Sequence, residues 1–189
     1  MDDQQISTTR RQVLLLGASL AVGALLPAGA RAARRSPGPE ERTPRELKLL
    51  NLHTGESLDA VYFEQGRYVP DALAEIDSVL RDHRTGEVHA IEPRLLDLLH
   101  RLSRTLESDA PYHVISGYRS PATNAMLHAA SPNVAAGSLH MQGWAIDVRV
   151  PGRQLAELHR AALGLRGGGV GYYPASDFVH VDVGRVRTW

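Results

Sequence analysis

The chain has 189 residues, of which 43% are hydrophobic, and its 21 basic and 21 acidic residues give a formal net charge of zero. This balance argues against a nucleic-acid partner, which requires a basic surface. Cysteine is absent, which excludes disulfides, thiolate metal ligands and a cysteine nucleophile. Any metal site therefore has to use histidine and carboxylate side chains, within what the length predicts to be one domain plus an additional segment.

The first 32 residues have the pattern of an export signal. Arg10 and Arg11 precede a moderately apolar run at residues 13–26, and residues 30–32 supply an Ala-x-Ala cleavage pattern. A membrane-spanning helix needs roughly 20 apolar residues, so this run is too short and too diluted by glycine and serine. We expect a twin-arginine signal peptide at residues 1–32 and a periplasmic mature chain without a transmembrane segment.

Residues 33–45 are polar and rich in proline, which predicts a flexible leader. The folded domain is expected to occupy residues 46–189. Its first elements are predicted to be two strands, at residues 47–52 and 60–63, joined as a hairpin through residues 53–56.

The remaining elements follow from periodicity and from helix start signals. A broad leucine stripe at residues 93–106, which begins with a proline, predicts a helix buried in the core. Further helices are expected at residues 70–83, 121–130 and 153–165, and further strands at residues 112–116, 144–149, 170–173 and 178–182.

Two of these strands carry candidate metal ligands. Residues 144–149 alternate so that Asp147 lies on the face away from the core. Residues 178–182 alternate in the same way and place His180 opposite the valines. If the two strands are adjacent, His140, Asp147 and His180 converge. Two imidazoles and one carboxylate suit zinc and leave a fourth position for water, as in catalytic zinc sites.

A hydrogen-bonded polar cluster is the alternative to this metal site, because a single histidine is more often solvated or structural than a ligand. The grouping favours the metal. His140 precedes Asp147 by seven residues, with small residues at positions 143 and 145, and core packing does not require such a pattern.

Arg119 lies in a polar loop that follows the strand at residues 112–116. Its planar guanidinium can bind a substrate carboxylate or a developing oxyanion through two hydrogen bonds, although a surface arginine in a turn is the alternative reading. Ser138, Tyr118 and Tyr173 are further candidates for substrate binding beside the predicted metal site.

Three motifs in the chain resemble those of the LAS-type zinc peptidases. They are Ser-x-His-x-x-Gly-x-Ala-x-Asp at residues 138–147, Ser-Gly-Tyr-Arg-Ser at residues 116–120, and Gly-Val-Gly-Tyr-Tyr-Pro followed by Phe-Val-His-Val-Asp at residues 169–182. Within this group the chain is similar to the MepK-type murein endopeptidases, also through residues 50–57 and the segment 187–189.

The resemblance implies an α+β fold in which a small antiparallel sheet carries the zinc site and is flanked by helices. It implies one zinc ion held by His140, Asp147 and His180, with Arg119 in contact with substrate. The implied activity is cleavage of peptide cross-links in peptidoglycan by metal-activated water.

The general base is open between two aspartates. Related peptidases carry a glutamate three residues before the last ligand, or a histidine two residues before it, and these positions hold Asp177 and Phe178. We favour Asp182, because it shares a strand face with His180, over Asp177, which has the matching offset.

Two other functions stay open at this stage: a non-catalytic peptidoglycan-binding domain that retains the metal, and a carboxypeptidase that trims stem peptides. An open three-ligand site favours an enzyme, because structural zinc sites normally have a fourth protein ligand. The sequence leaves open whether the cleaved cross-link joins two diaminopimelate residues or D-alanine to diaminopimelate, and it does not predict an oligomeric state.

Overall fold

The structure, a computed structural model, describes residues 43–131 and 134–189. The predicted signal peptide and the leader as far as residue 42 lie outside the described residues. No helix in the described ranges is long and apolar enough to cross a membrane. The first strand begins at Arg45, one residue before the predicted start of the domain.

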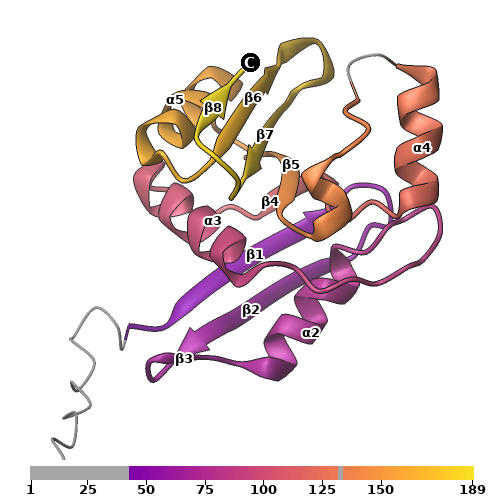
Figure 1. The fold of residues 1–189 in the computed structure, drawn as a ribbon. Helices are drawn as coiled ribbons and strands as arrows, with labels where there is room; N and C mark the ends of the chain where they lie inside the picture. Colours follow the sequence, from indigo (N-terminus) through magenta and orange to yellow (C-terminus); the bar gives the residue numbers. More distant parts are fainter. Residues whose placement is uncertain (1–42, 132–133) are drawn as a thin grey trace, which may run out of the picture. The chain divides into compact units, whose positions relative to one another are not determined.

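A mixed eight-stranded sheet forms the centre of the described part, in the order β3-β2-β1-β4-β5-β7-β6-β8 (Figure 1). The strands are β1 (Arg45–Asn51), β2 (Ser57–Glu64), β3 (Arg67–Tyr68), β4 (Tyr112–Ser116), β5 (Ala145–Arg149), β6 (Gly169–Tyr173), β7 (Phe178–Asp182) and β8 (Arg187–Thr188). The α+β class is confirmed, and so is the hairpin of β1 and β2. The expected small antiparallel sheet is corrected, because β1 pairs with β4, and β6 with β8, in parallel.

The helices of the described part are α2 (Pro70–Val79), α3 (Pro93–Thr105), α4 (Pro121–Ala130) and α5 (Leu155–Leu165), with short 3-10 turns η1 (Leu139–Gln142) and η2 (Pro174–Ser176). Helix α3 begins as its sequence predicts: Pro93 is the first helical residue, and the carboxylate of Glu92 accepts a hydrogen bond from the N–H of Arg94.

Helix α2 ends four residues before its predicted end at His83. The side chain of Asp82 accepts hydrogen bonds from the N–H groups of Arg84 and Thr85, which forms a turn in place of another helical turn. The carbonyl of Leu80 also accepts a hydrogen bond from Tyr118, so this turn is attached to the loop that carries Arg119.

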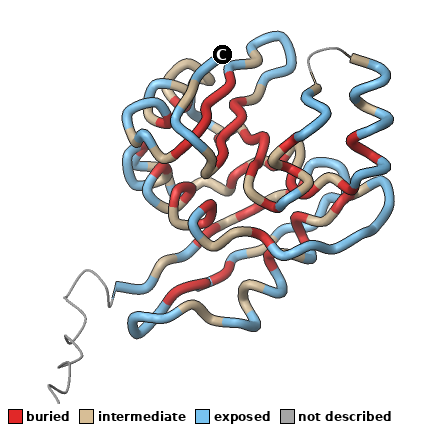
Figure 2. The backbone as a smooth tube through the Cα atoms, in the orientation of Figure 1, coloured by how far each residue is buried: buried red, intermediate tan, exposed pale blue. Residues whose placement is uncertain are grey.

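The core lies on the helix-covered side of the sheet. Helix α3 packs against β1 and α5, and α5 packs against β6 and β7. Figure 2 shows that the buried backbone segments include the central strands. Alternation places four aliphatic side chains of β5 and β7 in this core: Ile146, Val148, Val179 and Val181. The register pairs Asp147 with His180, so both side chains lie on the opposite face.

Candidate metal centre

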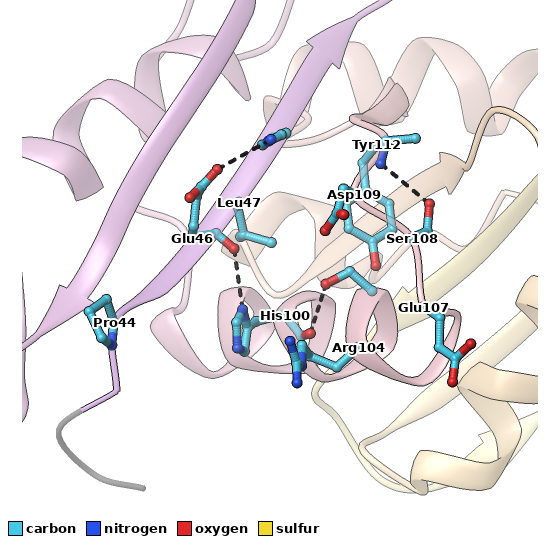
Figure 3. A pocket seen from close by; sticks show the side chains of 12 residues that line it. Pro44, Glu46, Leu47, His100, Arg104, Glu107, Ser108, Asp109 and Tyr112 are labelled. Carbon is cyan, nitrogen blue, oxygen red and sulfur yellow. Dashed lines mark hydrogen bonds and ion pairs between the residues drawn. The ribbon is translucent and has the colours of Figure 1, made fainter. Parts of the chain in front are cut away.

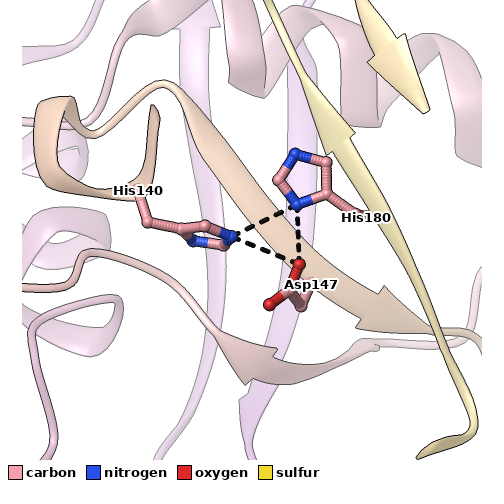
Figure 4. Close-up of side chains that lie close together, drawn as sticks. All are labelled: His140, Asp147 and His180. Atoms are coloured by element: carbon pink, nitrogen blue, oxygen red, sulfur yellow. Dashed lines mark hydrogen bonds and ion pairs between the residues drawn. The ribbon is translucent and has the colours of Figure 1, made fainter. Parts of the chain in front are cut away.

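His140 on η1, Asp147 on β5 and His180 on β7 converge as the sequence predicts (Figure 4). Oδ1 of Asp147 lies 3.2 Å from Nε2 of His140 and 2.8 Å from Nδ1 of His180, and the two nitrogens are 3.2 Å apart. All three side chains are buried. Within residues 43–131 and 134–189, no other group of three histidine or acidic side chains comes together in this way.

The local backbone fixes the orientation of His140. Ser138 caps η1 by accepting a hydrogen bond from the N–H of His140, and Gly143 ends the turn in the left-handed conformation with φ of +67°. Nδ1 of His140 is 2.7 Å from the carbonyl oxygen of Gly117, an acceptor, so Nδ1 donates its proton. Nε2 therefore directs its lone pair at the cluster, which is the orientation a metal ligand needs.

His180 is held through its other ring nitrogen. Its Nε2 lies 3.1 Å from Oδ2 of Asp182, so that a carboxylate orients the imidazole while Nδ1 faces the cluster. Asp182 is fully buried. Its two oxygens also accept hydrogen bonds from the backbone N–H groups of Gly169 and Gly184 and from the guanidinium of Arg187. Asp182 is thus behind His180, with both oxygens engaged.

Arg119 contacts the same cluster from the loop after β4. Its Nη2 donates a hydrogen bond to Oδ2 of Asp147, and its Nε donates to the hydroxyl of Ser116 at 2.7 Å. The backbone N–H of Arg119 donates to the carbonyl of His140 at 3.2 Å. The guanidinium is therefore fixed beside the ligand carboxylate, and only 14% of its side chain is exposed.

The electrostatics of the cluster suit a cation. Burial by itself would raise the pKa of Asp147, but the neighbouring imidazoles of His140 and His180 lower that pKa below its usual range. Burial lowers the pKa of His140, which favours the neutral, ligating imidazole. Burial also acts to lower the pKa of His180, but hydrogen bonds to Asp147 and Asp182 raise it overall. Two imidazole nitrogens and an ionised carboxylate oxygen, each with a partner behind it, can hold a divalent metal.

The cluster borders a cavity of about 490 Å³. Its lining includes residues between α4 and η1, among them Val134, Ala135, Gly137 and Ser138. It also includes aromatic side chains from β6, from β7 and from the segment after β8. Ser138, Tyr173 and Arg119, three of the candidates for substrate binding, line this cavity. The volume lies within the range of small-ligand sites, so part of a peptide can enter.

Tyr118 and Asp177 are not among the residues that line this cavity. Tyr118 is buried, stacks on His89 and donates its hydroxyl proton to Glu87 at 2.6 Å. Its backbone N–H donates a hydrogen bond to the Leu80 carbonyl. Asp177 is exposed and forms an ion pair with Arg149 at 2.6 Å.

A second cavity, of about 530 Å³, lies beside α3 and β1 (Figure 3). His100 and Glu46 approach each other there, with Nδ1 of His100 at 3.2 Å from the Glu46 carbonyl oxygen. Tyr112 donates its hydroxyl proton to the Leu99 carbonyl. None of the three candidate ligands lines this cavity, so the metal chemistry belongs to the first one.

Three residues at or next to the site were not predicted from the sequence. Trp189 and Arg187 line the cavity because β8 pairs with β6 and brings this segment next to His180. Asp82 was also missed: it is buried and accepts a hydrogen bond from the N–H of Ser120, the residue after Arg119. The only sequence signal for Trp189 and Arg187 was the resemblance at the segment 187–189.

An α+β fold with a buried His-Asp-His cluster on the border of a cavity is typical of a metal-dependent enzyme. A family model described as peptidoglycan L,D-endopeptidase MepK matches residues 40–189. The chain belongs to this family.

Individual relatives cover between 77% and 98% of this chain. The peptidoglycan L,D-endopeptidase MepK of Escherichia coli (strain K12) is 42% identical over 185 residues, which are 98% of this chain and 99% of that protein. A Haemophilus influenzae protein named "Probable peptidoglycan L,D-endopeptidase MepK" is 43% identical over 147 residues, 77% of this chain and 79% of that protein.

Proposed function

We propose that this protein is a zinc-dependent peptidoglycan L,D-endopeptidase, which hydrolyses peptide cross-links of the cell wall at a bond between an L- and a D-configured centre. The observation that carries the proposal is the ligand cluster itself. Within the described residues the cluster has three members on the border of a cavity. The nearby Asp182 contacts Nε2 of His180, the ring nitrogen that faces away from the cluster, so it is not a fourth ligand. Such a set leaves a position open, as catalytic zinc sites do.

When bound, zinc supplies Lewis-acid activation of water and of the scissile carbonyl. His140, Asp147 and His180 are the residues that would hold it. Arg119 stabilises negative charge that develops on the substrate, because its guanidinium is fixed beside the cluster by Ser116 and Asp147. Those contacts use Nε and Nη2, so Nη1 is the nitrogen that we assign to a substrate oxygen.

We propose that Asp182 orients the imidazole of His180. The strand face that Asp182 shares with His180 favoured it as the general base, but we do not assign it that role. Its oxygens already accept hydrogen bonds from two backbone N–H groups and from Arg187, and burial separates it from the cavity. A general base has to reach the attacking water, and Asp182 does not.

Asp177 is then the carboxylate that we assign to proton transfer. Asp177 does not itself line the cavity, but it lies between Ser176 and Phe178, which both do, and it has the offset at which related peptidases carry glutamate. The role requires the exposed side chain of Asp177 to turn from Arg149 into the cavity. Its ion pair with Arg149 is exposed, so exchanging this partner for a water molecule costs little free energy.

We further propose that residues 1–32 direct export through the twin-arginine route and that residues 33–45 connect them to the peptidase domain at 46–189, which acts in the periplasm. The paired arginines support this, and peptidoglycan lies outside the cytoplasm. Replacing Arg10 and Arg11 with lysine should leave precursor in the cytoplasm. Normal maturation in cells that lack the twin-arginine pathway would contradict this route.

Digestion of defined muropeptides by the mature chain, with products identified by mass spectrometry, tests the activity. The proposal predicts that a dimer cross-linked through an L,D bond is converted to monomers. Loss of only a terminal residue from monomeric stems would indicate the carboxypeptidase. Binding to sacculi without any product would indicate the binding domain. The substrate panel should include both types of cross-link that the sequence left open.

A further inference from the structure

Three aromatic side chains, Tyr173, Phe178 and Trp189, form one side of the metal-centre cavity, and we call them the aromatic wall. The rings of Tyr173 and Phe178 stack with centroids 4.6 Å apart. The indole of Trp189 donates its N–H to the hydroxyl of Tyr173 at 2.7 Å, and its centroid is 5.2 Å from that of His180. The wall therefore begins directly beside a candidate metal ligand.

The indole is held in place although 49% of Trp189 is exposed. The backbone N–H of Trp189 donates a hydrogen bond to the carbonyl of Val170, and the carbonyl of Trp189 accepts one from the N–H of Tyr172. The guanidinium carbon of Arg187 lies 4.9 Å from the ring centroid. A Cβ atom at Gly171 would be 2.7 Å from Cε2 of the indole, so the absence of a side chain there lets the ring lie close to β6. A large apolar surface fixed in this way is typical of a binding surface.

Other residues that line the cavity differ in size and chemistry from the aromatic wall. Ala135, Gly137 and Ser138 line the same cavity with small groups. Arg119 and Arg187 line the same cavity. The cavity thus combines an apolar aromatic surface with guanidinium groups, which suits a ligand with a methylene chain and a carboxylate.

A peptide cross-link has this chemistry. It requires a residue with a second amino group, and methylene groups separate that amino group from the residue's own backbone. We propose that the aromatic wall binds the methylene chain of this cross-linking diamino acid, and that Trp189 thereby determines which cross-links are cleaved. The inference rests on the proposed endopeptidase function and deepens it, because it assigns the substrate feature that the site recognises.

The test compares two synthetic cross-linked dimers that differ only in the cross-linking diamino acid, one with the full side chain and one shortened by two methylene groups. Each buried methylene contributes about fourfold in binding, so the zinc-loaded protein should prefer the longer dimer by about 15-fold in kcat/KM. Trp189→Ala should reduce this preference to less than about threefold and should retain one zinc ion per chain. Val186→Ala, an exposed apolar residue outside the wall, should keep the full preference.

Two further variants separate the wall from a general effect on folding. Trp189→Phe keeps an aromatic face and should keep most of the length preference. Gly171→Ala keeps the indole but displaces it, and should reduce the preference while leaving zinc content unchanged. If Trp189→Ala and Gly171→Ala both discriminate between the dimers as well as the wild type does, the inference is wrong.

Calorimetry with the metal-depleted protein measures the affinity for each dimer without turnover. The ratio of the two affinities is a second measure of the preference for the longer dimer. If the wild type binds the longer dimer preferentially but hydrolyses neither, the proposed function fails while the wall is supported. If it hydrolyses both dimers equally and binds them equally, the function stands and the wall is refuted.

Discussion

On one face of β5 and β7, four branched aliphatic side chains pack against the helices, whereas on the other face Asp147, His180 and Asp182 are buried almost as deeply. The two faces are stabilised differently. Apolar burial is non-directional and scales with area, so neighbouring side chains can compensate for small changes. The buried polar groups need specific partners, and here the described contacts supply them.

Because of this difference, we expect substitutions on the two faces to change different properties of the protein. A change on the apolar face should lower the free energy of unfolding and leave the metal content of folded molecules intact. A change on the polar face should alter metal binding and catalysis more than folding.

The largest effect is expected from removing a ligand. His140→Ala leaves two protein ligands, and a two-ligand site does not retain zinc through purification. Hydrolysis of cross-linked dimers should fall to background while the circular dichroism spectrum stays that of the wild type, because the core does not depend on the cluster. One zinc ion per chain in this variant, by elemental analysis, would show that His140 is no ligand.

The next effect separates the two aspartates. Asp177→Asn should lower turnover by about 10² to 10⁴, the usual range for loss of general-base catalysis, without loss of zinc. Asp182→Asn should instead weaken zinc affinity by about 10- to 100-fold, since it removes the carboxylate that orients a ligand. Metal titrations and turnover at saturating zinc, measured on both variants, distinguish the roles. Normal zinc affinity in Asp182→Asn with a loss of turnover would return the proton-transfer role to Asp182.

On the apolar face, Leu99→Ala should lower the free energy of unfolding by about 2 to 5 kcal/mol, because it leaves a cavity at a fully buried position of α3. Urea unfolding measures this loss. Zinc per folded molecule should not change. Loss of zinc from folded Leu99→Ala would mean that the two faces are coupled, contrary to the comparison.

The smallest effect is a pH dependence at Asp82, which supports the loop of Arg119. Burial would raise the pKa of Asp82, but hydrogen bonds from Thr123 and Ser120 hold that pKa below its usual range. The ionised carboxylate therefore stabilises the fold above its unfolded-state pKa of about 4, and this contribution is lost as the pH falls through the lower folded-state pKa. Asp82→Asn should cost roughly 1.5 to 3 kcal/mol at pH 7.

The difference between Asp82→Asn and the wild type should shrink as the pH falls below about 4, where Asp82 of the unfolded chain begins to bind a proton while that of the folded chain is still ionised. Unfolding curves at a series of pH values measure it. A difference that is constant from pH 7 to pH 3 would indicate that shape, and not charge, accounts for the effect.

Local patterns predicted much of this molecule, because they reflect interactions between near neighbours in the chain. Alternation placed Asp147 and His180 on one face, and the register of β5 with β7 confirms this placement. Alternation also placed Asp182 correctly on the face of His180. It did not reveal that the N–H of Gly169 and the guanidinium of Arg187 donate hydrogen bonds to the Asp182 carboxylate.

What the sequence did not predict depends on contacts between distant segments. The parallel pairing of β1 with β4 depends on the order of strands in the sheet, which local periodicity does not encode. Tyr118 is buried through contacts with a segment distant in the chain, because its ring stacks on His89 and its hydroxyl binds Glu87. Trp189 reaches the cavity only through the pairing of β8 with β6, and a two-residue strand has no recognisable pattern.

The central claim is that the polar face of β5 and β7 forms a zinc-dependent peptidase. Titration of zinc into the metal-depleted mature chain, with the rate of dimer hydrolysis measured at each step, tests it most directly. The account predicts no hydrolysis without metal and a rise that reaches its maximum at one zinc ion per chain, with no rise in His140→Ala. Hydrolysis that persists in the presence of a strong chelator, or an equal rise in His140→Ala, would contradict the account.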